Sequence, residues 1–92
     1  MARYLVFHTM DPRLATSVNQ MAITKAVIDS FTADVYCITT WSAVGAGKLA
    51  CIWEAPSEQA IIDACVNMEN VPIDGIYPAV IIDWAEMKKA LA

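Results

Sequence analysis

His8 is the single histidine of this 92-residue chain, and its unperturbed pKa near neutrality makes it the first candidate for chemistry. It ends a stretch that is rich in β-forming residues, where an imidazole ring could bind a metal ion or transfer a proton. A satisfied, hydrogen-bonded sheet histidine at the dimer face is the structural alternative. The sequence leaves both open, and metal or ligand uptake by a His8→Ala variant would distinguish them.

The three cysteines, Cys37, Cys51 and Cys65, form neither an even set nor a C-x-x-C pair. The spacing therefore predicts no disulfide framework and no zinc motif. We expect buried, reduced thiols that behave as small apolar side chains, with a metal or redox role as the alternative.

Glu54 lies among apolar neighbours, where burial would raise the pKa of its carboxyl and allow it to act as a base or a ligand. An ion pair is the simpler interpretation, and Arg3 on a neighbouring antiparallel strand is a suitable partner. Four aromatic residues could line a cavity between sheet and helices or between two sheets: Tyr4, Tyr36, Trp41 and Trp53. The alternative is a plain aromatic core. Trp41 lies at a strand-loop junction, where a cavity mouth would open.

Two catalytic motifs are excluded. The segment Gly45-Ala-Gly-Lys48 lacks the full phosphate-loop pattern, and no helix follows it. A single histidine without a nucleophile elbow also argues against a hydrolase triad.

Residue patterns predict the elements that position these side chains. We expect four strands, at Arg3–Thr9, Asp34–Trp41, Lys48–Glu54 and Gly75–Asp83. We expect helices at Asp11–Ser30 and Ser57–Glu69 and a short terminal helix at Trp84–Leu91. The predicted inner stripe of the first helix is Leu14, Val18, Met21, Ala22, Ile28 and Phe31, with Ile23 and Val27 beside it. That of the second helix is Ile61, Ala64, Cys65 and Met68.

The order β-α-β-β-α-β predicts one ferredoxin-like α+β domain over residues 1–92, with a four-stranded antiparallel sheet and both helices on one face. Strands two and three form a hairpin. Pro78 has no N–H to donate, so its strand should lie at a sheet edge.

The apolar content, 58% with a mean hydropathy of +0.45, exceeds the ~45–50% of typical soluble domains. No run of ~20 apolar residues is present, so we expect no membrane span. Both faces of the second and fourth strands are apolar, whereas a lone antiparallel sheet leaves one face polar. We therefore predict a homodimer, or a higher oligomer, that packs sheet against sheet.

A net charge of −4 and scattered basic residues argue against nucleic-acid binding. The N-terminus enters a strand pattern directly and lacks a secretory signal. We expect a soluble, cytoplasmic protein.

Several motifs resemble those of the small bacterial DUF4242-type proteins between Tyr4 and Val80. They are Trp41 with the glycine-containing loop after it, Cys51-Ile-Trp-Glu-Ala-Pro-Ser57, and Pro72-Ile-Asp-Gly-Ile76. The resemblance implies a ferredoxin-like fold related to the dimeric α+β barrels, and some members of this family bind nickel.

The family's histidines differ from those of this chain. His8 matches one of them, whereas Ile38 or Thr39 and Cys65 stand where members often carry the others. The resemblance thus implies a divalent transition metal such as nickel, with His8 and Cys65 as ligands, and one histidine and one cysteine from each subunit could supply a site across a dimer.

We expect a ligand site formed by His8, Tyr36, Trp41 and Glu54. The first functional hypothesis is a homo-oligomeric module that binds a metal or small ligand without catalysis. The second is a cofactor-free enzyme of the dimeric α+β barrel type, an isomerase or a monooxygenase. The third is an interaction protein without a ligand.

Overall fold

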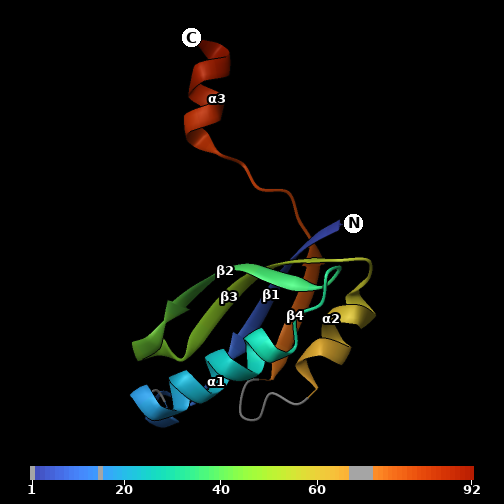
Figure 1. Cartoon of the computed structure of the whole chain (residues 1–92). Helices are drawn as coiled ribbons and strands as arrows, with labels where there is room; N and C mark the ends of the chain where they lie inside the picture. Colours follow the sequence, from blue (N-terminus) through green and yellow to red (C-terminus); the bar gives the residue numbers. More distant parts are fainter. Residues whose placement is uncertain (1, 15, 67–71) are drawn as a thin grey trace.

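A four-stranded antiparallel sheet with the order β2-β3-β1-β4 forms the centre of the molecule (Figure 1). It is described by a computed structural model that covers residues 2–14, 16–66 and 72–92. The strands are β1 (Ala2–Thr9), β2 (Tyr36–Ala43), β3 (Lys48–Ala55) and β4 (Ile73–Pro78). The helices are α1 (Ser17–Asp29), α2 (Glu58–Cys65) and α3 (Trp84–Leu91), with 3-10 turns η1 (Pro12–Leu14) and η2 (Val44–Ala46).

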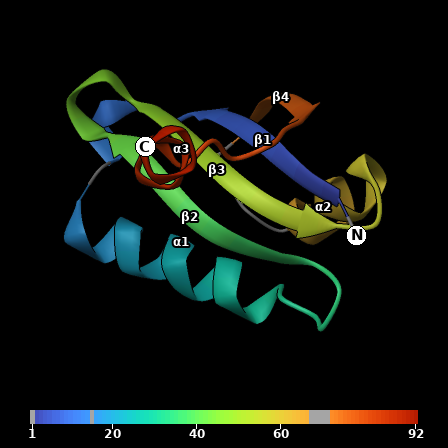
Figure 2. The ribbon, with the colours of Figure 1, turned by 90° about the horizontal axis from the view of Figure 1, so that it is seen from above.

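This arrangement is the predicted ferredoxin-like α+β fold, in which α1 and α2 lie on one face of the sheet (Figures 1 and 2). The β2–β3 hairpin and the edge position of Pro78 are also confirmed. The fourth strand is shorter than predicted. It ends at Pro78, and Ala79 makes one more backbone bond to Arg3 (N···O 3.0 Å) before the chain leaves the sheet.

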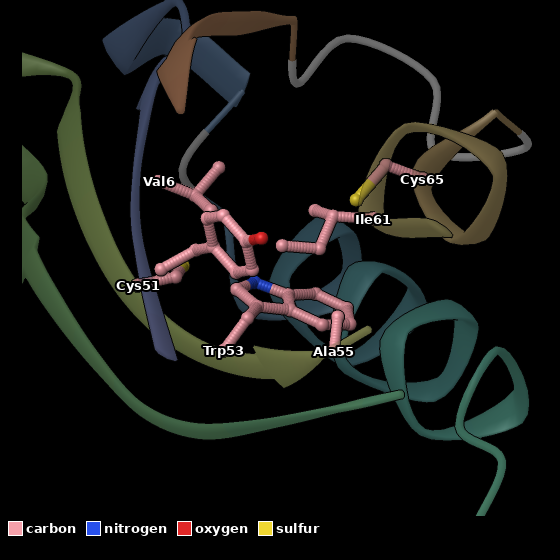
Figure 3. Packing of buried hydrophobic residues seen from close by; sticks show 7 residues of the cluster. Val6, Cys51, Trp53, Ala55, Ile61 and Cys65 are labelled. Carbon is pink, nitrogen blue, oxygen red and sulfur yellow. The ribbon is translucent and has the colours of Figure 1, made fainter. Parts of the chain in front are cut away.

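The core lies between the sheet and the helices. Figure 3 shows Val6, Cys51, Trp53 and Ala55 from the sheet facing Ile61 and Cys65 from α2. Phe31 packs edge-on against Trp53, with ring centroids 5.9 Å apart. Burial of these large side chains removes apolar surface from water and is the main source of stability for so small a domain.

The first helix differs from its prediction at its N-terminal end. Asp11 accepts hydrogen bonds from the Arg13 backbone N–H (2.9 Å) and pairs with the Arg13 guanidinium (2.6 Å), so it closes a local turn instead of capping the helix. The helix α1 begins later, after Thr16, whose hydroxyl accepts the Asn19 N–H at 3.2 Å.

The inner face of α1 also differs from its prediction. Val27 packs against the core, whereas Val18, Met21 and Ile28 of the predicted stripe are exposed. The predicted stripe included Leu14 and Phe31, which lie outside α1. The face of the helix expected to point towards the core was therefore wrong.

The second helix begins as predicted. The Ser57 hydroxyl accepts the Ala60 N–H at 3.2 Å, and Ile61 and Cys65 are buried. The predicted Met68 contact and the predicted end at Glu69 lie outside the described residues.

The other side of the sheet is apolar and uncovered by any described helix. This open face is formed by Leu5, Phe7, Trp41, Ile52 and Tyr77, which the strand register places on the same side. Phe7 and Tyr77 stack edge-on at 6.1 Å, and Trp41 is 72% exposed. The helix α3 stands away from this side of the sheet (Figure 1).

In the described part of the chain, every helix is too short or too polar to cross a bilayer.

Candidate functional site

A cavity of about 360 Å³ lies between α1 and the sheet. Its walls combine an apolar majority with a few polar groups, as is usual for small-molecule sites. The helix contributes Gln20, Ile23, Thr24, Val27 and Ile28. The remaining walls are His8, Met10, Cys37, Thr40, Ser42, Leu49, Cys51 and Trp53.

His8 lines this cavity and is only 4% exposed. Its Nδ1 lies 3.3 Å from the carbonyl oxygen of Pro72, which can only accept a hydrogen bond. The proton of a neutral imidazole is therefore placed on Nδ1, and Nε2 is the nitrogen with acceptor character. The hydrogen bond agrees with the predicted alternative of a satisfied sheet histidine, but His8 lies on the α1 side of the sheet and not on the open face where that alternative placed it.

Trp53 carries a buried donor for which the described residues supply no acceptor. The side chain is 1% exposed, and its indole Nε1 has no hydrogen-bond partner. Such groups are rare in folded proteins, because each costs roughly 1–3 kcal/mol in lost solvation. Trp53 also forms part of the cavity wall, but its indole nitrogen is itself buried, so a bound acceptor would pair with this N–H only after the neighbouring side chains shift.

Two thiols, Cys37 and Cys51, share the cavity wall with the Thr40 hydroxyl. Thr40 Oγ1 lies 3.2 Å from Cys51 Sγ and 3.6 Å from Cys37 Sγ. Hydrogen bonds from the neighbouring Cys51 thiol and from Thr40 lower the pKa of Cys37 to about 7. The contact with Cys37, together with burial, raises the pKa of Cys51. Cys37 is therefore the thiol that ionises near neutral pH.

Cys65 belongs to a different environment. It packs in the core beside Ile61 on α2 (Figure 3), and burial raises the pKa of its thiol to about 11. All three cysteines are free. Cys51 and Cys65 are buried, as predicted, whereas Cys37 is only half-buried.

A second polar group, Arg3, Tyr36 and Glu54, lies on the opposite side of the sheet from the cavity. The Arg3 guanidinium pairs with Glu54 at 2.9 Å, and the Tyr36 hydroxyl donates to the same carboxylate at 2.5 Å. The hydrogen bond from Tyr36, followed by that from Arg3, lowers the pKa of Glu54, while the carboxylate raises the pKa of Tyr36. The predicted Arg3–Glu54 ion pair is confirmed, and Glu54 lacks the raised pKa of a general base.

The four predicted ligand-site residues do not form one site. His8 faces the cavity, Tyr36 and Glu54 meet on the other side of the sheet, and Trp41 lies farther along that side. Strand alternation places Tyr36 and Glu54 on the side opposite to His8, and a β-bulge between Cys37 and Thr39 accounts for Trp41, because Ile38 is an extra residue in the β2–β3 pairing. It turns Trp41 to the open face and Thr40 to the cavity.

The cavity includes residues that the sequence did not single out as a site, above all Thr40, Gln20 and Thr24. The sequence indicates Trp53, Cys37 and Cys51 as candidates, but their residue types favour a place in the core over a place in a binding site. Alternation along β3 places Cys51 and Trp53 on the same side of the sheet. The sequence does not show that Thr40 lies opposite Cys51, because the bulge in β2 changes the register.

The residues do not fit the metal site that the family resemblance implies. Within the described residues, no three or more His, Cys, Asp or Glu side chains converge as a metal site, and nickel requires more ligands than His8 and Cys65 supply. Of these two residues, His8 lines the cavity whereas Cys65 lies on α2 and packs into the core. We derive no chemistry through a metal.

Comparison with known proteins identifies the fold. No protein-family model matches the chain, and no curated protein matches it. The chain is similar in structure to SCO4226 from Streptomyces coelicolor A3(2), known from a crystal structure, with a TM-score of 0.72 and 19% sequence identity. The match covers 89% of this chain and 100% of that chain. At this identity the likeness establishes the ferredoxin-like architecture and leaves the activity to the site itself.

Proposed function

We propose that this protein is a non-catalytic module that binds a small, mainly apolar molecule in the cavity between α1 and the sheet. The observation that carries the proposal is the mainly apolar cavity itself, whose wall includes Trp53, a residue with a buried indole N–H that has no acceptor among the described residues. A ligand with one carbonyl, ether or similar acceptor would accept a hydrogen bond from this donor and so remove the free-energy penalty of a buried, unpaired N–H.

The size and composition of the cavity support a compact ligand. A volume of about 360 Å³ is at the small end of the ~300–1,000 Å³ range of ligand pockets. Ile23, Val27 and Leu49 provide apolar contact, while Thr40 and His8 offer polar groups that would orient the bound molecule.

The test uses the naphthyl ketone dye prodan, whose emission shifts to the blue in apolar surroundings and whose ketone oxygen is an acceptor. We expect a saturable blue shift with the purified protein, and about tenfold weaker binding by Trp53→Phe, because one net hydrogen bond is lost. Trp41→Phe makes the same chemical change on the open face and should bind as the unmodified protein does.

A second variant protects the test against a folding defect in Trp53→Phe. Ile23→Phe fills part of the cavity from α1 and should also reduce prodan binding, with far-ultraviolet circular dichroism confirming the fold. Equal affinity in the unmodified protein, Trp53→Phe and Ile23→Phe would contradict the proposal. Native mass spectrometry would then identify any molecule that stays bound through purification.

A second candidate is a cofactor-free small-molecule enzyme that uses the same cavity, and Cys37 is the observation that favours it. A thiol with a pKa of about 7 is substantially ionised at neutral pH and is a competent nucleophile. A covalent adduct on Cys37 after incubation with cell metabolites, absent in Cys37→Ser, would favour catalysis over simple binding.

We also propose that the molecule is a homodimer formed through the open face. The centre of that face is apolar, with Leu5, Phe7 and Ile52, and its ends carry polar groups such as the Arg3–Glu54 pair. An apolar centre with a polar rim is typical of protein interfaces.

Membership of the DUF4242-type proteins and a cytoplasmic location complete the proposal. The ferredoxin-like strand order is compatible with that family, and three free cysteines are typical of a reducing compartment.

A further inference from the structure

Residues 79–92, here named the C-terminal arm, leave the domain on the side of the sheet opposite to α1 and α2. Figure 1 shows α3 standing off above the sheet, and Figure 2 shows it end-on in front of the strands. None of the residues of α3 is buried. We propose that this arm crosses to a second copy of the chain and packs α3 against it.

The arm carries apolar side chains that its own chain does not cover. Val80 is 85% exposed and Leu91 is 89% exposed, and Ile81, Ile82 and Trp84 are also exposed. This is a dense run of large apolar surface for a monomer to leave in water. A partner surface is therefore the expected destination of the arm.

The apolar side chains of α3 form a single stripe. Trp84, Met87 and Leu91 recur at intervals of three and four residues and so lie on one side of the helix. Lys88 and Lys89 occupy the rest of the last turn. An amphipathic helix of this kind is built to lie against an apolar partner.

The helix is specified locally but is too short to be stable alone. The Asp83 carboxylate accepts the Ala85 and Glu86 N–H groups at 2.9 and 3.2 Å, which caps the first turn. Lys89 pairs with Glu86 at 3.5 Å. Isolated helices below ~12–15 residues are marginal in water, so eight residues need a packing surface to persist.

The connecting segment keeps α3 away from its own sheet. The Ala79 N–H bonds to the Arg3 carbonyl oxygen at 3.0 Å, which fixes the start of the arm at the sheet edge. Val80, Ile81 and Ile82 are β-branched and favour extended backbone, and the segment contains no glycine that would reverse it. Folding back onto its own open face would need such a reversal.

The dimensions fit a partner that faces the sheet. This step depends on the homodimer proposed above, in which two open faces meet. Packed sheets lie about 10 Å apart, and the extended segment 79–83 spans roughly 16 Å. The arm is therefore long enough to reach beyond a facing sheet, and α3, which lies in front of β2 and β3 in Figure 2, would contact the partner and not its own chain. Each chain would hold the other in this way.

The first experiment measures the dimer dissociation constant by sedimentation velocity. The triple variant Trp84→Ala, Met87→Ala, Leu91→Ala keeps helix propensity and removes the stripe, and we expect its dissociation constant to rise by ~100-fold. The matched control, Lys88→Ala with Lys89→Ala, alters the polar side of the same helix and should change the constant by less than about threefold.

The second experiment asks which chain the arm contacts. A benzophenone photo-crosslinker replaces Trp84 in protein of natural isotope content, which is mixed with nitrogen-15 protein and irradiated. Crosslinks that join light to heavy chains are expected. Crosslinks confined to single chains would overturn the inference.

The outcomes separate this inference from the proposed function. A dimer that persists unchanged after removal of the stripe would refute the arm and leave the open-face dimer standing. A monomeric unmodified protein at micromolar concentration would refute both. Prodan binding is measured independently, because the cavity lies on the other side of the sheet from the arm.

Discussion

Glu54 receives a charged and a neutral donor from two different strands, Arg3 on β1 and Tyr36 on β2. The strand register makes this possible, since both residues are direct cross-strand partners of Glu54 on β3. The carboxylate is therefore stabilised in its ionised form, which suits a structural link between three strands.

This arrangement predicts how stability depends on pH. The pKa of Glu54 in the folded protein is below its ordinary value of 4.5, so folding binds fewer protons at this group than the unfolded chain does. Its stabilising effect is complete above about pH 4.5 and is lost as the pH falls further.

In thermal melts between pH 7 and pH 3, the melting temperature of Glu54→Gln should lie below that of the unmodified protein at pH 7 and approach it under acid conditions. For Tyr36→Phe, the melting temperature should fall with decreasing pH less steeply than in the unmodified protein and more steeply than in Glu54→Gln, because Arg3 still pairs with the carboxylate. Parallel curves for the unmodified protein and Glu54→Gln would show that Glu54 contributes nothing to the acid response.

At the residue scale, the sequence predicted pairs but not faces. The Arg3–Glu54 pair follows from counting along two antiparallel strands. The separation of Trp41 from the cavity does not, because the bulge at Ile38 inserts one residue into the alternation and reverses the parity of every later position in β2.

The backbone of the loop between β2 and β3 restricts which residue can stand at Gly47. Gly47 has a φ of 65°, and its carbonyl oxygen accepts the Met10 N–H at 2.8 Å. A Cβ at Gly47 would lie 2.1 Å from the Met10 carbonyl oxygen. The hairpin end is thereby attached to the end of β1, next to the cavity that Met10 lines.

Gly47→Ala should lower the free energy of unfolding by roughly 2 kcal/mol or more, because it combines the left-handed penalty with a backbone clash. Urea denaturation followed by circular dichroism measures the change. Gly45→Ala is the matched control, since a Cβ there meets no described atom within 4 Å. Equal losses in the two variants would rule out the backbone explanation.

At the element scale, short-range signals predicted the fold well. Ser57 begins α2 and Asp83 begins α3 because their side chains cap the first turn through local bonds. The inner face of α1 was not predictable in this way. Apolar residues surround that helix on several sides, so its orientation depends on contacts with Trp53 and the core that only the assembled sheet supplies.

The whole molecule divides its apolar excess among three places. One surrounds the cavity under α1, the second is the open face with Phe7, Trp41 and Tyr77, and the third is the C-terminal arm. Composition alone indicated that more apolar surface exists than one chain of this size covers. It could not indicate that part of the excess lies on an arm, because exposure of Val80 to Leu91 depends on where the chain leaves the sheet.

Phe7→Glu tests the open face as an interface. A carboxylate at the centre of an apolar contact between two copies would lose its hydration without gaining a partner. The dimer dissociation constant should therefore rise by two orders of magnitude or more. Light scattering coupled to size exclusion measures the mass. Ala33→Glu adds the same charge on an exposed turn and should leave the mass unchanged, whereas equal masses for all three proteins would refute the interface.

The indole N–H of Trp53 also offers a direct spectroscopic signal. The chain has three tryptophans. In the single chain Trp41 and Trp84 are exposed, so their indole N–H groups meet water, whereas that of Trp53 is enclosed without an acceptor among the described residues. In the monomer its proton resonance should therefore lie upfield of the other two in a nitrogen-edited NMR spectrum. Arrival of an acceptor would move that single peak downfield, so occupancy could be followed in crude extracts on nitrogen-15-enriched protein with no dye attached.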